Sequence, residues 1–180
     1  MKIKVNTPTW GNAPSSSVEK VISSVLENMD SCFGEALSED LWVHQNINAN
    51  PMVLGARGKN GEYIIQLSAT DCYWAQYCFQ FAHEYCHVRT NFENTSQKFR
   101  WFEETICELA SIFFLRMMSE TWRDKSPWPE LEGFTQHLFD YAQARIEDPL
   151  HQLPEETGLK GWFIGKISEL EVNQYIREYN

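Results

Sequence analysis

Hydrophobic and polar positions follow two periods along the chain, which divide it into a short mixed part and a longer helical part. Apolar side chains recur every three or four residues across 18–33, which predicts an amphipathic helix. Runs rich in β-branched and aromatic residues predict short strands at 41–44, 52–56 and 62–68. An asparagine-rich turn separates the first two runs, and Asn60-Gly61 is typical of a hairpin turn between the last two. Another short strand is expected within the partly irregular segment 1–17.

From residue 71 onward the apolar period is helical. The stretch 71–87 contains neither Gly nor Pro, and Ser68–Asp71 has the form of a capping box, or Thr70 alone of an N-cap, at its beginning. The run 112–118 is apolar nearly all round, which predicts a central core helix. Further helical ranges are expected at 97–121, 130–147 and 159–179. A small antiparallel or mixed sheet followed by a helical bundle is an α+β fold, expected to form one domain over residues 1–180.

The composition narrows the function classes. Of the 180 residues 43% are hydrophobic, enough for a substantial core, and the formal net charge is −10. An acidic surface repels nucleic acid and anionic membranes, so neither is expected as a partner. No apolar run reaches the roughly 18 residues of a membrane span, and no apolar signal segment is expected at the start. Five cysteines without framework spacing predict reduced thiols and a cytoplasmic protein.

One short motif carries recognisable chemistry: His83-Glu84-Tyr85-Cys86-His87. Positions four apart lie one above the other on a helix, so the imidazoles of His83 and His87 can reach the same ion. Glu84 is rotated by about 100° from His83, which places its carboxylate beside the ion rather than on it. This H-E-x-x-H arrangement predicts two zinc ligands and a general base. The alternative is a polar stripe at an exposed helix end, which the aromatic flanking residues disfavour.

A catalytic zinc site needs a third protein ligand and one position left for water. The metzincin pattern places a ligand six residues after the second histidine, with a glycine midway, but Glu93 and Thr90 occupy these positions and match it poorly. Glu104 is the better candidate, because small neighbours such as Cys107 let its helix approach the histidine helix closely. Glu108 lies one turn further on, where it could accept a hydrogen bond from a ligand histidine and fix the ring's orientation.

These two segments resemble the gluzincin branch of the zincin metallopeptidases, and this short, single-motif chain is most similar to the compact minigluzincin-like members. The resemblance covers residues 62–118 and includes the H-E-x-x-H motif, a downstream glutamate on the next helix, and a small residue and an acid three and four positions after that glutamate. It implies one Zn²⁺ ion with three ligands, a general base, and an acid behind the ligands: His83, His87 and Glu104, then Glu84, then Glu108.

The resemblance also implies that an extended substrate peptide pairs with a sheet edge beside the site. This role falls to the predicted strand or to its hairpin partner; the strand comprises Glu62, Tyr63, Ile64, Ile65, Gln66, Leu67 and Ser68. The alternative is that both are ordinary sheet strands without an open edge. A residue that stabilises the oxyanion is also expected. Four residues are chemically able, and the sequence does not choose among them: Arg89, His137, Tyr141 and His151.

The sequence therefore predicts a cytoplasmic zinc-dependent peptide hydrolase that acts on a peptide or protein substrate. In the alternative, the chain is a non-catalytic regulatory or interaction protein whose metal site is degenerate or structural. A fourth protein ligand, such as Cys86 or Glu103, would close the site and favour this alternative. An effector hydrolase directed at one host protein shares the same chemistry, because motif and fold do not fix the substrate.

Overall fold

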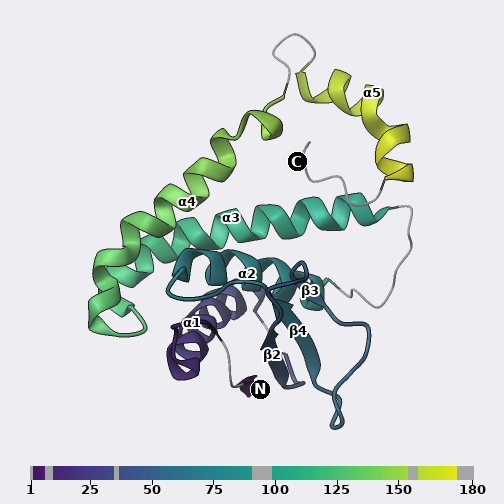
Figure 1. The fold of residues 1–180 in the computed structure, drawn as a ribbon. Helices are drawn as coiled ribbons and strands as arrows, with labels where there is room; N and C mark the ends of the chain where they lie inside the picture. Colours follow the sequence, from purple (N-terminus) through teal and green to yellow (C-terminus); the bar gives the residue numbers. More distant parts are fainter. Residues whose placement is uncertain (1, 7–9, 35–36, 91–98, 154–157, 174–180) are drawn as a thin grey trace.

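The computed structural model describes residues 2–6, 10–34, 37–90, 99–153 and 158–173, and it confirms an α+β fold with a small mixed sheet near the N-terminus followed by helices (Figure 1). The sheet has four strands in the order β1-β2-β4-β3. Their bounds are Ile3–Val5 for β1, Leu41–Gln45 for β2, Met52–Val53 for β3 and Tyr63–Leu67 for β4.

The pairing of the strands confirms one prediction and corrects another. β3 and β4 form the predicted antiparallel hairpin, although β3 is shorter than the expected 52–56. β2 does not pair with β3 across the asparagine-rich turn, because β4 lies between them and is parallel to β2. Within Glu62–Ser68, β4 is therefore an inner strand and cannot be the open edge. Its hairpin partner β3 stands at that end of the sheet.

The helices follow the predicted ranges with shifted ends. α1 spans Ser15–Phe33, α2 Trp74–Arg89, α3 Arg100–Lys125, α4 Thr135–Glu147 and α5 Gly158–Val172. The first part of the expected helix 130–147 is instead a 3₁₀ helix, η2 (Pro129–Phe134), and a second one, η3 (Pro149–His151), follows α4. Residues 97–98 and 174–179 of the expected helices lie outside the described ranges. No helix in the described ranges combines the length and apolar character that a membrane crossing requires.

The predicted cap of α2 is wrong. The helix begins at Trp74 without a side-chain cap, and Asp71 has a φ of 52°, which breaks a helix before it can start there. Asp71 is held in this conformation by a distant loop: its N–H donates to the Trp10 carbonyl over 2.9 Å, and its Oδ1 accepts from the Asn12 N–H over 2.8 Å. The loop approaches so closely that a Cβ on Gly11 would lie 2.5 Å from Asp71 Oδ1.

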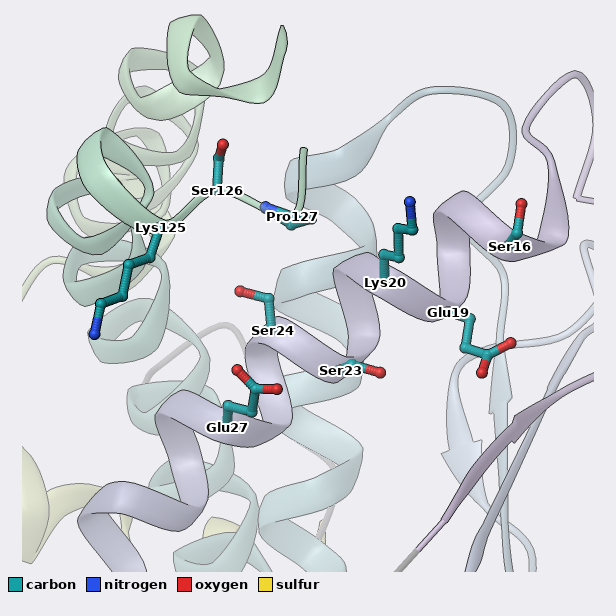
Figure 2. Close-up of a pocket in the computed structure, with 9 residues that line it drawn as sticks. All are labelled: Ser16, Glu19, Lys20, Ser23, Ser24, Glu27, Lys125, Ser126 and Pro127. Carbon is teal, nitrogen blue, oxygen red and sulfur yellow. The ribbon is translucent and has the colours of Figure 1, made fainter. Parts of the chain in front are cut away.

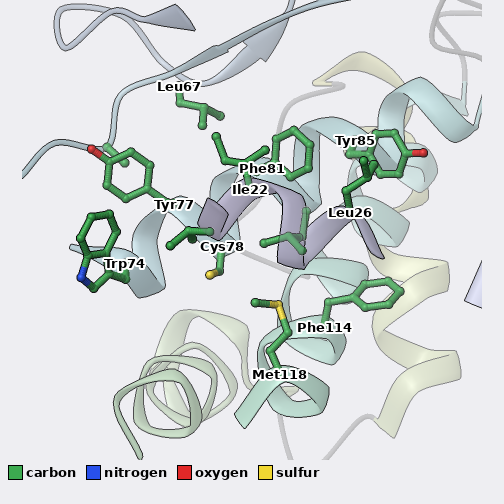
Figure 3. Packing of buried hydrophobic residues seen from close by; sticks show 14 of the residues in the cluster. Ile22, Leu26, Leu67, Trp74, Tyr77, Cys78, Phe81, Tyr85, Phe114 and Met118 are labelled. Carbon is green, nitrogen blue, oxygen red and sulfur yellow. The ribbon is translucent and has the colours of Figure 1, made fainter. Parts of the chain in front are cut away.

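The core lies between the sheet, α1, α2 and α3 (Figures 1 and 3). One face of the sheet is covered by α1 and α2, α3 packs on the other side of α2, and α4 packs on α3. Figure 3 shows side chains of the three inner helices in this cluster, among them Ile22 of α1, Phe81 of α2 and Met118 of α3. α2 is therefore enclosed along almost its whole length, and any polar side chain on it needs a partner inside the protein.

Gln80 shows how this demand is met. Its Oε1 accepts from the backbone N–H groups of Ser68 and Ala69, both over 3.0 Å, and its Nε2 donates to Ser68 Oγ over 2.9 Å. Each such bond stabilises the fold by about 1 kcal/mol. Together they fix α2 against the end of β4, and with it the position of the H-E-x-x-H motif one turn further along.

Candidate metal centre

Two neighbouring helices bring the predicted ligands together in the interior. His83 and His87 lie one turn apart on α2, and Glu104 faces them from α3. The two histidine Nε2 atoms are 3.2 Å apart, and the Glu104 carboxylate lies 3.3 Å from His83 Nε2 and 3.5 Å from His87 Nε2. Ligand atoms about 2.0–2.2 Å from one tetrahedral zinc ion lie roughly 3.3 Å from each other. The three side chains are thus spaced as a shared cation requires.

The outer nitrogens of both rings face carboxylates. His87 Nδ1 lies 2.8 Å from Glu103 Oε1, and His83 Nδ1 lies 3.5 Å from Glu108 Oε2. An ionised carboxylate only accepts hydrogen bonds, so a proton on Nδ1 of each ring would face an acid and would leave the Nε2 lone pair directed to the centre. Two lone pairs and a carboxylate that face one another at this distance repel each other unless a cation lies between them.

The pKa of His87 reflects the same need for positive charge. Burial lowers this pKa, but the carboxylates of Glu104 and Glu103 raise it by more, so that the net shift is upward. In the metal-free protein a proton on His87 would partly neutralise the centre. A metal ion displaces that proton and neutralises the centre more fully.

Glu108 has the orienting position expected for it, and α4 supplies a residue that the sequence did not point to. Arg145 reaches across from α4 and donates to Glu108 Oε1 from Nε over 3.1 Å and from Nη2. Burial raises the pKa of Glu108, but the contacts with His83 and Arg145 outweigh it and hold this pKa below its ordinary value. Glu108 therefore favours its ionised form, with its carboxylate 3.5 Å from His83 Nδ1.

Glu84 is buried on α2 beside the first ligand, as are Glu104 and Glu108 on α3. Several carboxylates in one interior region carry a large desolvation cost unless positive charge compensates them. Arg145 compensates Glu108, and Arg100 Nε lies 4.0 Å from Glu104 Oε1. A divalent cation among the three ligands would supply the remaining compensation, and the residues present fit such an ion.

The two candidates for a fourth protein ligand are engaged elsewhere. Glu103 contacts the outer nitrogen of His87, and Cys86 shares a side-chain hydrogen bond with Cys107 of α3. In the described ranges, the group of side chains able to hold one ion consists of His83, His87 and Glu104. Both cysteines are buried.

The four candidates for oxyanion stabilisation have partners away from the three ligands. Arg89 Nη1 lies 3.3 Å from Asp30 Oδ1 of α1, and His137 stacks on Phe134 with ring centroids 4.7 Å apart. Tyr141 packs against Phe79 of α2, and His151 Nδ1 lies 2.7 Å from the Arg145 carbonyl. These contacts leave the oxyanion role unassigned.

A surface pocket of about 440 Å³ lies between α1 and the end of α3 (Figure 2). Serines and charged side chains of both signs line it, and Figure 2 shows Lys20 and Glu27 on α1 across from Lys125. None of the three ligands lines it, and its mixed charge does not select an anion or a cation.

Comparison of the chain with protein-family models, with curated proteins and with solved structures finds no match. The geometry of the centre is therefore the basis on which a function can be proposed for the chain. Two features of the centre could not be found from the sequence. One is Arg145, which no spacing connects to the motif, and the other is the orienting role of Glu103. The adjacent acids at 103 and 104 were a usable signal, because neighbouring positions on a helix point about 100° apart and cannot share one role.

Proposed function

We propose that the chain is a zinc-dependent peptide hydrolase in which His83, His87 and Glu104 hold one zinc ion. The observation that carries the proposal is the convergence of the two Nε2 atoms and the Glu104 carboxylate, with an acid facing each outer ring nitrogen. Two imidazoles and one carboxylate suit zinc, whereas magnesium and calcium prefer sites built from oxygen ligands alone. Three protein ligands leave room for a water or a substrate oxygen.

Zinc at such a site supplies a Lewis acid that makes a water molecule acidic and polarises a carbonyl group. Glu84 is the proposed general base: its carboxylate takes a proton from the attacking water and delivers it to the departing amine. The position of Glu84 directly after a proposed ligand and its burial in the interior support this role.

The proposed substrate is an extended peptide that adds to the sheet at β3. β3 ends the strand order, and α2, which carries the motif, contacts both β3 and β4. Backbone N–H and C=O groups of an outer strand can hold a peptide in register by strand addition. The same edge serves peptides of many sequences, so this proposal does not fix a cleavage preference.

Glu84→Gln tests the function directly, because it preserves shape and removes the base. We expect the wild type, purified without added metal, to contain close to one zinc per chain and to cleave unstructured peptides. Glu84→Gln should retain the zinc and lose turnover by a factor of about 10² to 10⁴.

His83→Ala is the matched variant that should lose both the metal and the activity. If the wild type and His83→Ala contain equal traces of metal, the proposed centre is wrong. If the wild type and Glu84→Gln both retain zinc and neither cleaves peptides, the site is a non-catalytic metal centre and the hydrolase proposal fails.

A further inference from the structure

Gln66 is a buried polar side chain in the otherwise apolar second half of β4. It is 5% exposed, and its neighbours Ile65 and Leu67 are fully buried in the core. Because side chains alternate along a strand, Gln66 lies on the face of the sheet opposite to Ile65 and Leu67. A buried amide needs hydrogen-bond partners, so the segment that covers Gln66 on this second face has to supply them.

The loop between β2 and β3 supplies these partners from both of its ends. Gln66 Oε1 accepts from Asn46 Nδ2 over 3.2 Å, and Gln66 Nε2 donates to the Asn50 carbonyl over 2.9 Å. Asn46 follows β2 directly, and Pro51 alone separates Asn50 from β3. The Asn46 N–H also donates to the Leu67 carbonyl over 2.8 Å. The Gln66 side chain therefore holds the end of the loop from which β3 starts.

The position of β3 depends on this hold. β3 is only two residues long, so its ladder with β4 provides few backbone hydrogen bonds. Met52, its first residue, is paired directly with Gln66. The Leu54 N–H donates to the Ile64 carbonyl over 2.8 Å and extends the pairing by one residue beyond β3. Gln66 thus attaches the outer strand to β4 through its side chain as well as through its backbone.

A second buried glutamine attaches the motif helix to the same strand. The hydrogen bonds of Gln80 to Ser68 and Ala69 hold α2 at the end of β4, two residues after Gln66. His83 follows Gln80 by three residues on α2. β4 therefore carries both attachments, that of the outer strand β3 and that of the helix with the two histidines. The distance between a peptide on β3 and the metal centre depends on both.

We infer that Gln66 is a positioning residue that sets the place of β3, the proposed substrate edge, relative to the metal centre. The inference rests on the proposed function, in which a peptide adds to β3 and is cleaved at the zinc ion. Gln66 acts through Asn50 and β3, not by touching the peptide or the metal. Without its hydrogen bonds β3 shifts against α2, and the peptide moves out of register while the three ligands keep their geometry. A misplacement of about 1 Å can lower a rate by roughly 100-fold.

Peptide binding and cleavage by variants of the full chain test the inference. Gln66→Met keeps a similar volume and removes both hydrogen bonds. In the Glu84→Gln background, where the peptide is not consumed, the Kd of a fluorescein-labelled unstructured peptide should rise about tenfold. With Glu84 present, kcat/KM should fall by at least the same factor. Zinc per chain and the far-UV circular dichroism should equal those of the wild type.

Gln45→Met is the matched control. Gln45 Nε2 donates to the Ala69 carbonyl over 2.7 Å, so this glutamine joins the end of β2 to the chain after β4 and does not contact β3. Gln45→Met should lower the unfolding temperature, as Gln66→Met does, and leave the peptide Kd at the wild-type value. An equal rise of Kd in both variants would mean that Gln66 only stabilises the sheet, and the inference would be wrong.

The inference and the proposed function fail separately. If the wild type cleaves peptides and Gln66→Met has the same Kd and kcat/KM, only the positioning role is wrong. If zinc is bound and peptides bind in a Gln66-dependent way without being cleaved, the hydrolase proposal fails and the positioning role stands. A zinc-loaded wild type that neither binds nor cleaves peptides overturns both. If Gln66→Met does not fold, Gln66→Asn replaces it, because its shorter amide cannot reach both partners and should also raise Kd.

Discussion

The two faces of α3 reverse the usual arrangement of a helix in a globular protein. The inner face carries the acids Glu104 and Glu108 into the interior, and the outer face presents Phe102, Leu109 and Phe113 to solvent. Hydrophobic residues normally lie inside and acids outside, so both faces are exceptions in the same 26-residue helix. Each exception costs free energy in the isolated chain unless something outside that chain compensates it.

The difference between the faces indicates what each one lacks. Buried carboxylates around two imidazole rings lack positive charge, and the proposed metal ion would supply it. The aromatic and aliphatic side chains of the outer face, by contrast, are in contact with solvent.

Glu104→Ala should have the largest effect on the inner face, because it removes a ligand from a three-ligand site. The neighbouring Glu103→Ala is its matched control, since it removes an acid from the same helical turn that touches only the outer nitrogen of His87. We expect Glu104→Ala to abolish zinc retention and Glu103→Ala to weaken zinc about 10- to 100-fold.

Competition with a chelator of known affinity measures both zinc dissociation constants. If both variants lose zinc affinity equally, the assignment of Glu104 as the ligand is contradicted. If Glu103→Ala loses more, Glu103 is the ligand and Glu104 has the orienting role.

The same substitution at two adjacent positions compares the inner side of α3 with its outer side. The two variants are Phe114→Ala and Phe113→Ala. Phe114 is buried in the core, so its truncation should lower the free energy of unfolding by about 3–5 kcal/mol. Phe113 is more than half exposed and should cost about 1 kcal/mol or less in the monomer. Urea unfolding at low protein concentration measures this difference without a contribution from association. Similar costs for both would mean that Phe113 is as well packed as Phe114 in solution.

The ligands could be predicted from the sequence because their geometry is local. The i, i+4 spacing of His83 and His87 on a helix fixes where both rings point, and the helical period after residue 100 places Glu104 and Glu108 on one side. The structure brings all four together as expected. Such periodicity constrains neighbours one turn apart whatever the rest of the fold does.

The parts that the sequence did not reveal depend on contacts between distant segments. Arg145 reaches Glu108 across 37 positions, and no local spacing encodes that contact. The cap predicted at Thr70 gave way to hydrogen bonds between Asp71 and the loop at Trp10, which a local propensity does not anticipate. β4 is an inner strand because β2 pairs with it in parallel, a pairing decided by the packing of the helices rather than by turn residues.

Arg145→Ala should have a smaller effect, and it shows how far the inner face extends beyond the ligands. Removing the guanidinium leaves Glu108 buried without its ion pair, so that the acid moves or takes up a proton and ceases to orient His83. We expect zinc affinity to fall about 10-fold, less than in Glu103→Ala, because His83 itself is kept. Arg145→Lys should restore part of the loss, since it keeps the charge without the paired N–H geometry.

Arg116→Ala is the matched control for this last change. Arg116 also joins α3 to α4, through a 2.7 Å hydrogen bond to Gln143, but on residues that do not touch the centre. If Arg145 acts only by fastening α4 to α3, both variants should lower the unfolding temperature. Their zinc affinities should then equal each other. If it acts through Glu108, only Arg145→Ala should weaken zinc, and the weakening should grow as pH falls and protonated Glu108 becomes more populated. Chelator competition at several pH values separates the two outcomes, because a purely structural link between the helices does not change the proton dependence of metal binding.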